Sequence, residues 1–226
     1  MNFPLILLLV ASSLSAKPLE VIRTIPHTGY SEGLDYSEGF LWHALPKEIL
    51  KIDPKDGSIV ARFKPGSEYS ESLKWWNGKL YNLSFSDNGI YVAKVANGQL
   101  PFERKGEAPE KHAWGAEVIG SHLVVTGDFS KKLYFLDESL KLVKTLETEA
   151  KDIEDLAYDG KYIWASSFTD PKGKIFRIDP KTGKAGPFYE LPHPEECPII
   201  DGLTFDGKNF WLTGKNCLSI YYIKKP

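Results

Sequence analysis

The feature that most constrains the fold is a motif that occurs five times along the chain. In its clearest copy, YSESLKWWNGKLYNL, the acid Glu71 is followed by an apolar run, an Asn-Gly turn and a second apolar run. The five copies start at Glu32, Glu71, Trp114, Glu154 and Asp201, at intervals of about 39, 43, 40 and 47 residues, which is the range expected for one four-stranded propeller blade per repeat.

Each copy is followed by a third run of strand-forming residues, as in ILKIDPKDG and KIFRIDPKTG, punctuated by Asp-Pro, Asp-Gly or Thr-Gly turns. Short segments rich in Ile, Val, Tyr, Phe and Trp between turn residues are typical of β-sheet. We therefore predict an all-β fold, a five-bladed β-propeller. The last copy is one strand short of four, so we expect residues 19–25 to complete the final blade as its outer strand and close the ring.

The composition is that of one globular domain. The chain has 226 residues, of which 42% are hydrophobic, enough for a single domain with a full core. Its formal net charge of −2 does not favour binding to nucleic acid or to an anionic membrane surface.

The first residues, MNFPLILLLVASSLSA, have the pattern of a signal peptide. Their apolar run is too short to span a bilayer and is followed by small residues. We predict a signal peptide over residues 1–16, a mature domain over residues 17–226, and export to the periplasm or the medium. The alternative is an uncleaved apolar anchor; no other segment could cross a membrane.

Both cysteines, Cys197 and Cys217, fall in the last repeat. In an oxidising compartment they could form one disulfide across that blade, although two unpaired cysteines remain the alternative. Neither their spacing nor their neighbours indicate a zinc site. We interpret the five histidines as structural or surface residues, since none has ligand spacing or a nucleophile beside it.

The repeat starts predict a cluster of acids. The first strand of a propeller blade lines the central channel, so the five starting residues should lie near one end of it, and four of them are acids that would raise one another's pKa. Lys215, in the segment TGKN after the second run of the last copy, is the expected charge partner. Phe168 holds a comparable place in the fourth copy, as an aromatic wall or as core. The alternative is that the acids point outward and cap backbone amides.

From about Tyr30 to Ile223 the chain resembles the plant and bacterial type of glutaminyl-peptide cyclotransferase, a five-bladed propeller. The segments that carry the resemblance are YSESLKWWNGKLYNL, KHAWGAE, KLYFLDESLKLVKTLE, RIDPKTGK and LTGKN. The resemblance implies conversion of N-terminal glutamine to pyroglutamate with loss of ammonia, without a metal or other cofactor. It also implies that Glu71 and Lys215 are catalytic and that Trp114 is a pocket residue.

The chain departs from that family at four positions of the pocket. Glu32, Glu154 and Asp201 stand where the family has neutral amides, and Phe168 stands where it has a second tryptophan. We expect these four residues and Trp114 to bind substrate, namely the N-termini of peptides or proteins, in a monomeric enzyme.

Two other functions are compatible with these acids. One is a calcium-dependent propeller hydrolase of the lactonase type, in which the ring of carboxylates would supply hard oxygen ligands to Ca²⁺. The other is a non-catalytic propeller that captures a cationic or amine-bearing ligand.

Overall fold

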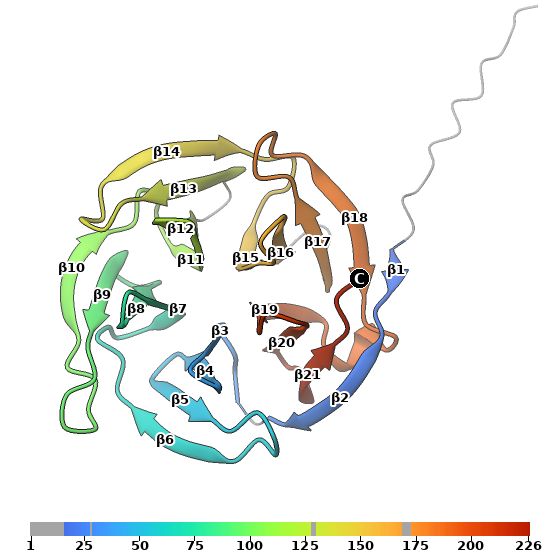
Figure 1. The fold of residues 1–226 in the computed structure, drawn as a ribbon, viewed down its shortest axis with the longest axis horizontal. Coiled ribbons are helices and arrows are strands. Elements are labelled where there is room, and N and C mark those ends of the chain that lie inside the picture. Colours follow the sequence, from blue (N-terminus) through green and yellow to red (C-terminus); the bar gives the residue numbers. More distant parts are fainter. Residues whose placement is uncertain (1–15, 28, 128–129, 169–172) are drawn as a thin grey trace, which may run out of the picture.

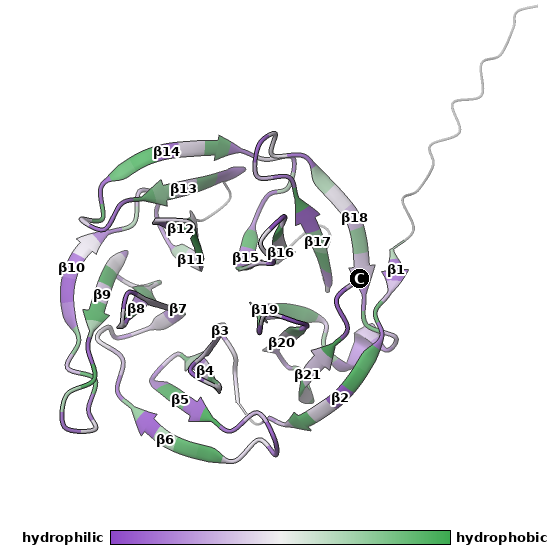
Figure 2. Cartoon of the chain, in the orientation of Figure 1, coloured by the Kyte–Doolittle hydropathy of each residue, from purple (hydrophilic) through white to green (hydrophobic). Residues whose placement is uncertain are grey.

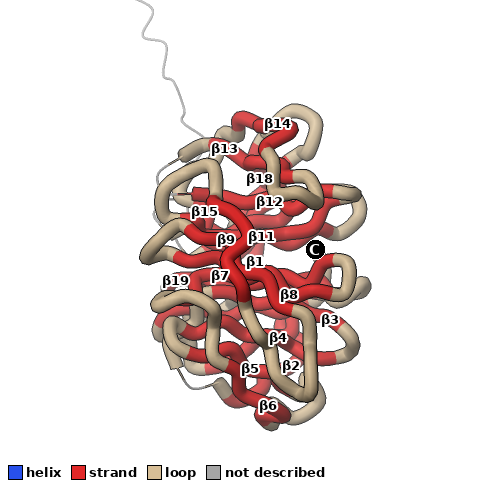
Figure 3. The backbone as a smooth tube through the Cα atoms, turned by 90° about the vertical axis from the view of Figure 1, so that its left-hand side faces the viewer, coloured by secondary structure: helices blue, strands red, loops and turns tan. Residues whose placement is uncertain are grey.

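The protein is a five-bladed β-propeller, as predicted. The computed structural model describes residues 16–27, 29–127, 130–168 and 173–226, so the predicted signal peptide lies outside the described residues except for Ala16. Five sheets are arranged in a ring (Figure 1), and the side view shows mainly strands and connecting loops (Figure 3). One short 3-10 helix, η1 (Pro194–Glu196), precedes β19. The described residues contain no helix long and apolar enough to cross a membrane.

The blades share one order, in which consecutive antiparallel strands run from the channel to the rim. From inner to outer strand they are β3 (Gly33–Ser37), β4 (Phe40–Leu45), β5 (Glu48–Ile52) and β6 (Ile59–Phe63); β7 (Ser70–Trp76), β8 (Lys79–Ser84), β9 (Gly89–Ala93) and β10 (Glu103–Glu107); β11 (Ala113–Ile119), β12 (His122–Gly127), β13 (Lys132–Leu136) and β14 (Leu142–Glu147); β15 (Ile153–Tyr158), β16 (Ile163–Ser167), β17 (Lys174–Ile178) and β18 (Ala185–Glu190); and β19 (Ile199–Phe205), β20 (Phe210–Lys215), β21 (Ser219–Ile223) and β2 (Val21–Pro26).

The two ends of the chain meet in the last blade, which confirms the predicted closure. Strand β2 pairs antiparallel with β21, with Val21 opposite Ile223 and Pro26 opposite Ser219. A short strand that the sequence did not predict, β1 (Lys17–Pro18), pairs parallel with the outer strand β18 of the preceding blade. The N-terminal segment therefore joins two blades and covers one exposed sheet edge.

Side chains packed between the blades form the core. Three tryptophans at the same place in the repeat, Trp42, Trp164 and Trp211, are among the largest fully buried side chains. Strands toward the rim carry hydrophobic and hydrophilic stretches (Figure 2), because one face packs on a neighbouring blade while the other meets solvent. Gly115 in the inner strand β11 allows close packing at the channel, since a Cβ there would lie 2.7 Å from the carbonyl oxygen of Glu154.

Four of the five inner strands, all but β3, are irregular where their repeats start. Pairing with the second strand shifts register between Ser70 and Ser72, between Ala113 and Ala116, between Ile153 and Leu156, and between Ile200 and Gly202. Each interval contains a repeat-start residue: Glu71, Trp114, Glu154 or Asp201. Because a bulge redirects side chains and increases local twist, these shifts turn the starting residues toward the end of the channel.

Deeper in the channel, buried polar groups tie the inner strands together. Lys74 Nζ of β7 lies 2.7 Å from Asp35 Oδ1 of β3 and 3.2 Å from Glu117 Oε2 of β11. The same carboxylates also accept hydrogen bonds from the backbone N–H groups of Trp75 and Tyr158. Although burial opposes it, the neighbouring carboxylates, Asp35 foremost, raise the pKa of Lys74 above its ordinary value. Lys74 therefore stays charged.

Removing this buried lysine should destabilise the propeller. Lys74→Met leaves Asp35 and Glu117 buried without their cation, which in buried pairs costs about 3–5 kcal/mol. Urea denaturation at neutral pH measures the loss. The control is Lys79→Met, which changes an exposed lysine in the next strand; equal stabilities of the two variants would contradict a structural role for Lys74.

Candidate functional site

A cavity of about 520 Å³ lies where the acids converge. It is lined by Tyr30, Tyr69, Glu71, Phe85, His112, Trp114, Glu154, Phe168 and Lys215. The predicted site residues are thus brought together: five of the seven line the cavity or its wall, and Glu32 and Asp201 lie buried directly behind Lys215. The acids point inward, so the alternative of outward-pointing caps is wrong.

Lys215, at the end of β20, forms ion pairs with two of the buried acids. Its Nζ lies 3.1 Å from Glu32 Oε2 and 3.0 Å from Asp201 Oδ2, and its side chain is 12% exposed. Although burial opposes it, the carboxylates of Asp201 and Glu154 raise the pKa of Lys215. The Tyr69 hydroxyl donates a hydrogen bond to the other oxygen of Glu32. Glu32 is thus held between a cation and a phenol.

Glu71 is a buried acid that has no partner among the described residues. Its carboxyl forms no hydrogen bond or ion pair with the described residues, although it is only 3% exposed and lines the cavity. Burial, and next the Glu32 carboxylate, raise the pKa of Glu71 well above its ordinary value. A buried carboxyl with a raised pKa and a free face is suited to accept and return a proton.

Glu154 and Asp201 form a second pair of acids. Both side chains are buried, and each shifts the pKa of the other. Burial, and next Asp201, raise the pKa of Glu154 well above its ordinary value. Burial raises the pKa of Asp201 to about 7, against the attraction of Lys215. Both shifts have the same first cause, the removal of a carboxyl group from water, which disfavours its charged form.

Aromatic rings form the remaining walls. Trp114 is buried and Phe168 is 38% exposed, with ring centroids 6.5 Å apart, so Phe168 is a wall residue rather than core. Lys215 Nζ lies 5.7 Å from the Phe168 ring and 5.5 Å from the Tyr30 ring. On the other side Phe85 stacks on His112, with centroids 4.5 Å apart.

Four residues that line the cavity were not predicted from the sequence. Their positions relative to the repeats follow two simple rules. Tyr30, Tyr69 and His112 each lie two residues before a repeat start, and alternate residues of an extended chain share a face. Phe85 follows the second strand of its blade, as Phe168 does in another. His112, which we interpreted as a structural or surface histidine, lines the cavity.

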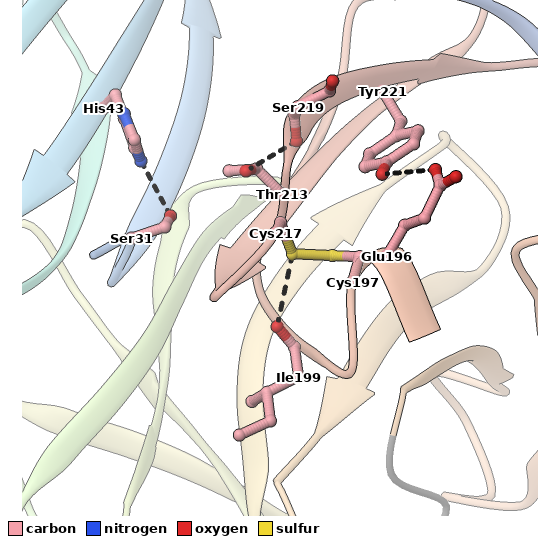
Figure 4. Close-up of a disulfide and its surroundings, with 9 residues drawn as sticks. All are labelled: Ser31, His43, Glu196, Cys197, Ile199, Thr213, Cys217, Ser219 and Tyr221. Atoms are coloured by element: carbon pink, nitrogen blue, oxygen red, sulfur yellow. Dashed lines mark hydrogen bonds between the residues drawn. A yellow bond between two sulfur atoms is a disulfide. The ribbon is translucent and has the colours of Figure 1, made fainter. Parts of the chain in front are cut away.

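A disulfide braces the turn that carries Lys215. Cys197, just before β19, is bonded to Cys217 in the turn between β20 and β21 (Figure 4). The bond therefore links the approach to Asp201 with the segment that follows Lys215, and it fixes the two partners of one ion pair relative to each other.

The donor set does not resemble a calcium site. The described residues include no group of three or more His, Cys, Asp or Glu side chains arranged to hold a metal ion. The ammonium group of Lys215 lies between Glu32 and Asp201, where a bound cation would have to sit.

Comparisons with known proteins place this geometry in context. The family model described as glutamine cyclotransferase matches residues 9–225. No curated protein matches the chain in sequence. Among solved structures, Myxococcus xanthus glutaminyl cyclase is similar with a TM-score of 0.76 and 17% identity, covering 92% of this chain and 98% of that one. Virginiamycin B lyase from Staphylococcus aureus has a TM-score of 0.55 and 14% identity, covering 87% of this chain and 66% of that one.

Removing the central cation should make stability strongly dependent on pH. Lys215 lowers the pKa values of Glu32, Glu71, Glu154 and Asp201, so Lys215→Met raises all four. A carboxyl group has a pKa of about 4 in the unfolded chain. If folding raises that pKa, the folded state loses stability as the pH rises above about 4. The variant should therefore lose more melting temperature at pH 8 than at pH 5, relative to wild type. Lys208→Met, an exposed lysine of the same blade, is the control; a loss independent of pH would contradict this electrostatic role.

Proposed function

The chain belongs to the glutamine cyclotransferase family, and from that premise we propose that it converts the N-terminal glutamine of peptides to pyroglutamate with release of ammonia. The observation that carries this proposal is Glu71, a buried carboxyl that has no partner among the described residues and lines the cavity together with Lys215. The peptide's α-amine attacks the side-chain amide carbon, a five-membered ring closes, and the amide nitrogen leaves as ammonia.

Glu71 is proposed as the general base and general acid. It takes a proton from the α-amine as the N–C bond forms, and it returns that proton to the departing nitrogen as the C–N bond breaks. No net proton is gained or lost, which suits a single carboxyl. The raised pKa of Glu71 brings it closer to that of an amine, as efficient proton transfer requires.

Lys215 is proposed to stabilise the oxyanion. Its ammonium group has three N–H donors, and Glu32 and Asp201 occupy two directions. The third donor is then available to the carbonyl oxygen of the substrate amide, which becomes negative in the tetrahedral intermediate. A donor of this kind contributes roughly 10²–10³-fold to the rate in other enzymes.

The aromatic walls are proposed to orient the substrate. The methylene groups of a glutamine side chain can pack between Trp114 and Phe168, which holds amine and amide close enough to react. The half-exposed Phe168 and Tyr30 would meet the following residue of the peptide.

We propose that the enzyme acts outside the cytoplasm, in the periplasm or secreted, as a monomer. The predicted signal peptide over residues 1–16 supports export, and the Cys197–Cys217 bond suits an oxidising compartment.

The decisive experiment uses a peptide that begins with glutamine. Wild-type protein should release ammonia and lower the mass of the peptide by about 17 Da, the mass of ammonia. Glu71→Gln should lower kcat by roughly 10²–10⁴-fold, because proton transfer by the carboxyl is lost. Mass spectrometry and an ammonia assay measure both.

The matched control is Glu68→Gln, which changes an exposed glutamate three residues away and should turn over as wild type does. Absence of turnover by wild type across a panel of glutamine-initiated peptides, or full activity of Glu71→Gln, would overturn the proposal.

A further inference from the structure

The first two blades begin with the same three residues, Tyr-Ser-Glu, at positions 30–32 and 69–71. In both copies the tyrosine lines the cavity, and so does Glu71. The serines, Ser31 and Ser70, do not line it and are fully buried. Because alternate residues of an extended chain share a face, the serine of each copy points into its blade while its two neighbours belong to the site.

Each buried serine hydroxyl is held by a polar side chain of the second strand of its blade. His43 Nε2 of β4 lies 2.7 Å from Ser31 Oγ, and Asn82 Nδ2 of β8 donates a hydrogen bond of 2.7 Å to Ser70 Oγ. Both partners are fully buried, and each lies 12 residues after its serine. The two contacts are therefore the same serine anchor, built at the same place in two successive blades.

The fold itself does not require the serine anchor. At the place of the serine the other three copies have buried apolar residues, namely Ala113, Ile153 and Ile200. Replacing a buried hydrogen-bonded pair by apolar groups of the same shape can be nearly neutral for stability. A hydrogen bond is directional, however, whereas apolar contact is not. The anchor therefore fixes the direction of the chain at the residues beside the serine.

In the second blade the anchor spans the bulge that carries Glu71. The pairing of β7 with β8 shifts register between Ser70 and Ser72, so Glu71 is the extra residue of β7. Asn82 Nδ2 donates to Ser70 Oγ before the bulge and, at 2.9 Å, to the carbonyl oxygen of Ser72 after it. On the other side β3 packs closely, since a Cβ on Gly33 would lie 2.9 Å from Ser72 Cα. The bulge is thus confined from both sides.

We propose that Ser70 and Asn82 are positioning residues, which aim the carboxyl of Glu71 at the amine of the substrate. The equivalent pair in the first blade holds Glu32 against Lys215 by the same means. A general base must lie within hydrogen-bond reach of the proton that it takes, so the direction of Glu71 matters for the rate. The catalytic part of this inference rests on the proposed function, whereas the direction in which the anchor holds the carboxyl does not.

The split between kcat and KM tests the catalytic part. Ser70→Ala removes the hydroxyl, and Asn82→Leu replaces the amide by apolar groups of similar shape. Because a misplacement of about 1 Å can cost roughly 10²-fold, each variant should lower kcat by about 10–10²-fold on a glutamine-initiated peptide. KM should stay within about twofold, since Glu71 acts in proton transfer. The double variant should be no slower than the slower single variant, because both act on one bulge.

The matched control is Asn209→Leu. Asn209 is another buried asparagine, whose amide donates a hydrogen bond of 3.1 Å to the Tyr222 hydroxyl, and it precedes β20 at the end opposite Lys215. This variant should lose stability but keep kcat. If Asn82→Leu does not fold, Ser70→Ala decides alone, since it deletes a single oxygen atom. Wild-type kcat in folded Ser70→Ala, or an equal loss of kcat in the control, would overturn the proposal.

Crystal structures without substrate separate this inference from the proposed function. In Ser70→Ala the carboxyl of Glu71 should move by about 1 Å, the scale at which misplacement affects catalysis. In Ser31→Ala the 3.1 Å contact between Glu32 and Lys215 should lengthen. Unchanged positions of both acids would show that the serines do not position them. If wild type does not turn over glutamine-initiated peptides, the proposed function fails, and these structures still decide whether the anchor directs Glu71.

Discussion

The site depends on one buried cation, which is surrounded by more carboxyl groups than its single charge can neutralise. Lys215 is the one lysine or arginine lining the cavity in the described part of the chain, and it forms ion pairs with Glu32 and Asp201. Burying further carboxylates without partners would cost several kcal/mol each. Burial accordingly raises the pKa values of Glu71, Glu154 and Asp201, and it makes Glu71 a base with a raised pKa.

The architecture could be predicted from the sequence because one repeat occurs five times along the chain. Strand number, blade order and closure by the N-terminal strand all depend on that period and on the missing strand at Ile223. The short strand β1 could not be predicted, since Lys17 and Pro18 have no strand pattern and pair only because β18 presents an open edge.

The acids of the site were also predictable, because they stand at one position of the repeat. What the sequence could not show is that the inner strands shift register there, as between Ser70 and Ser72 around Glu71. A shift of one residue turns a side chain to the other face of the sheet, so repeat alignment alone left open whether these residues faced the channel. Tyr69 and His112 were missed for a related reason. The prediction used only the first residue of each repeat, whereas a strand presents every second residue to the same face.

The channel contains two polar layers that differ in how completely their groups are paired. In the deeper layer, Asp35 and Glu117 bind Lys74 and also accept backbone N–H groups from neighbouring blades. A buried network with every member satisfied is rigid. In the upper layer, Glu71 has no partner among the described residues, and the oxygens of Asp201 accept no N–H hydrogen bond there. The same residue types thus hold the ring together where they are satisfied, whereas Glu71, which lines the cavity, remains available to a substrate.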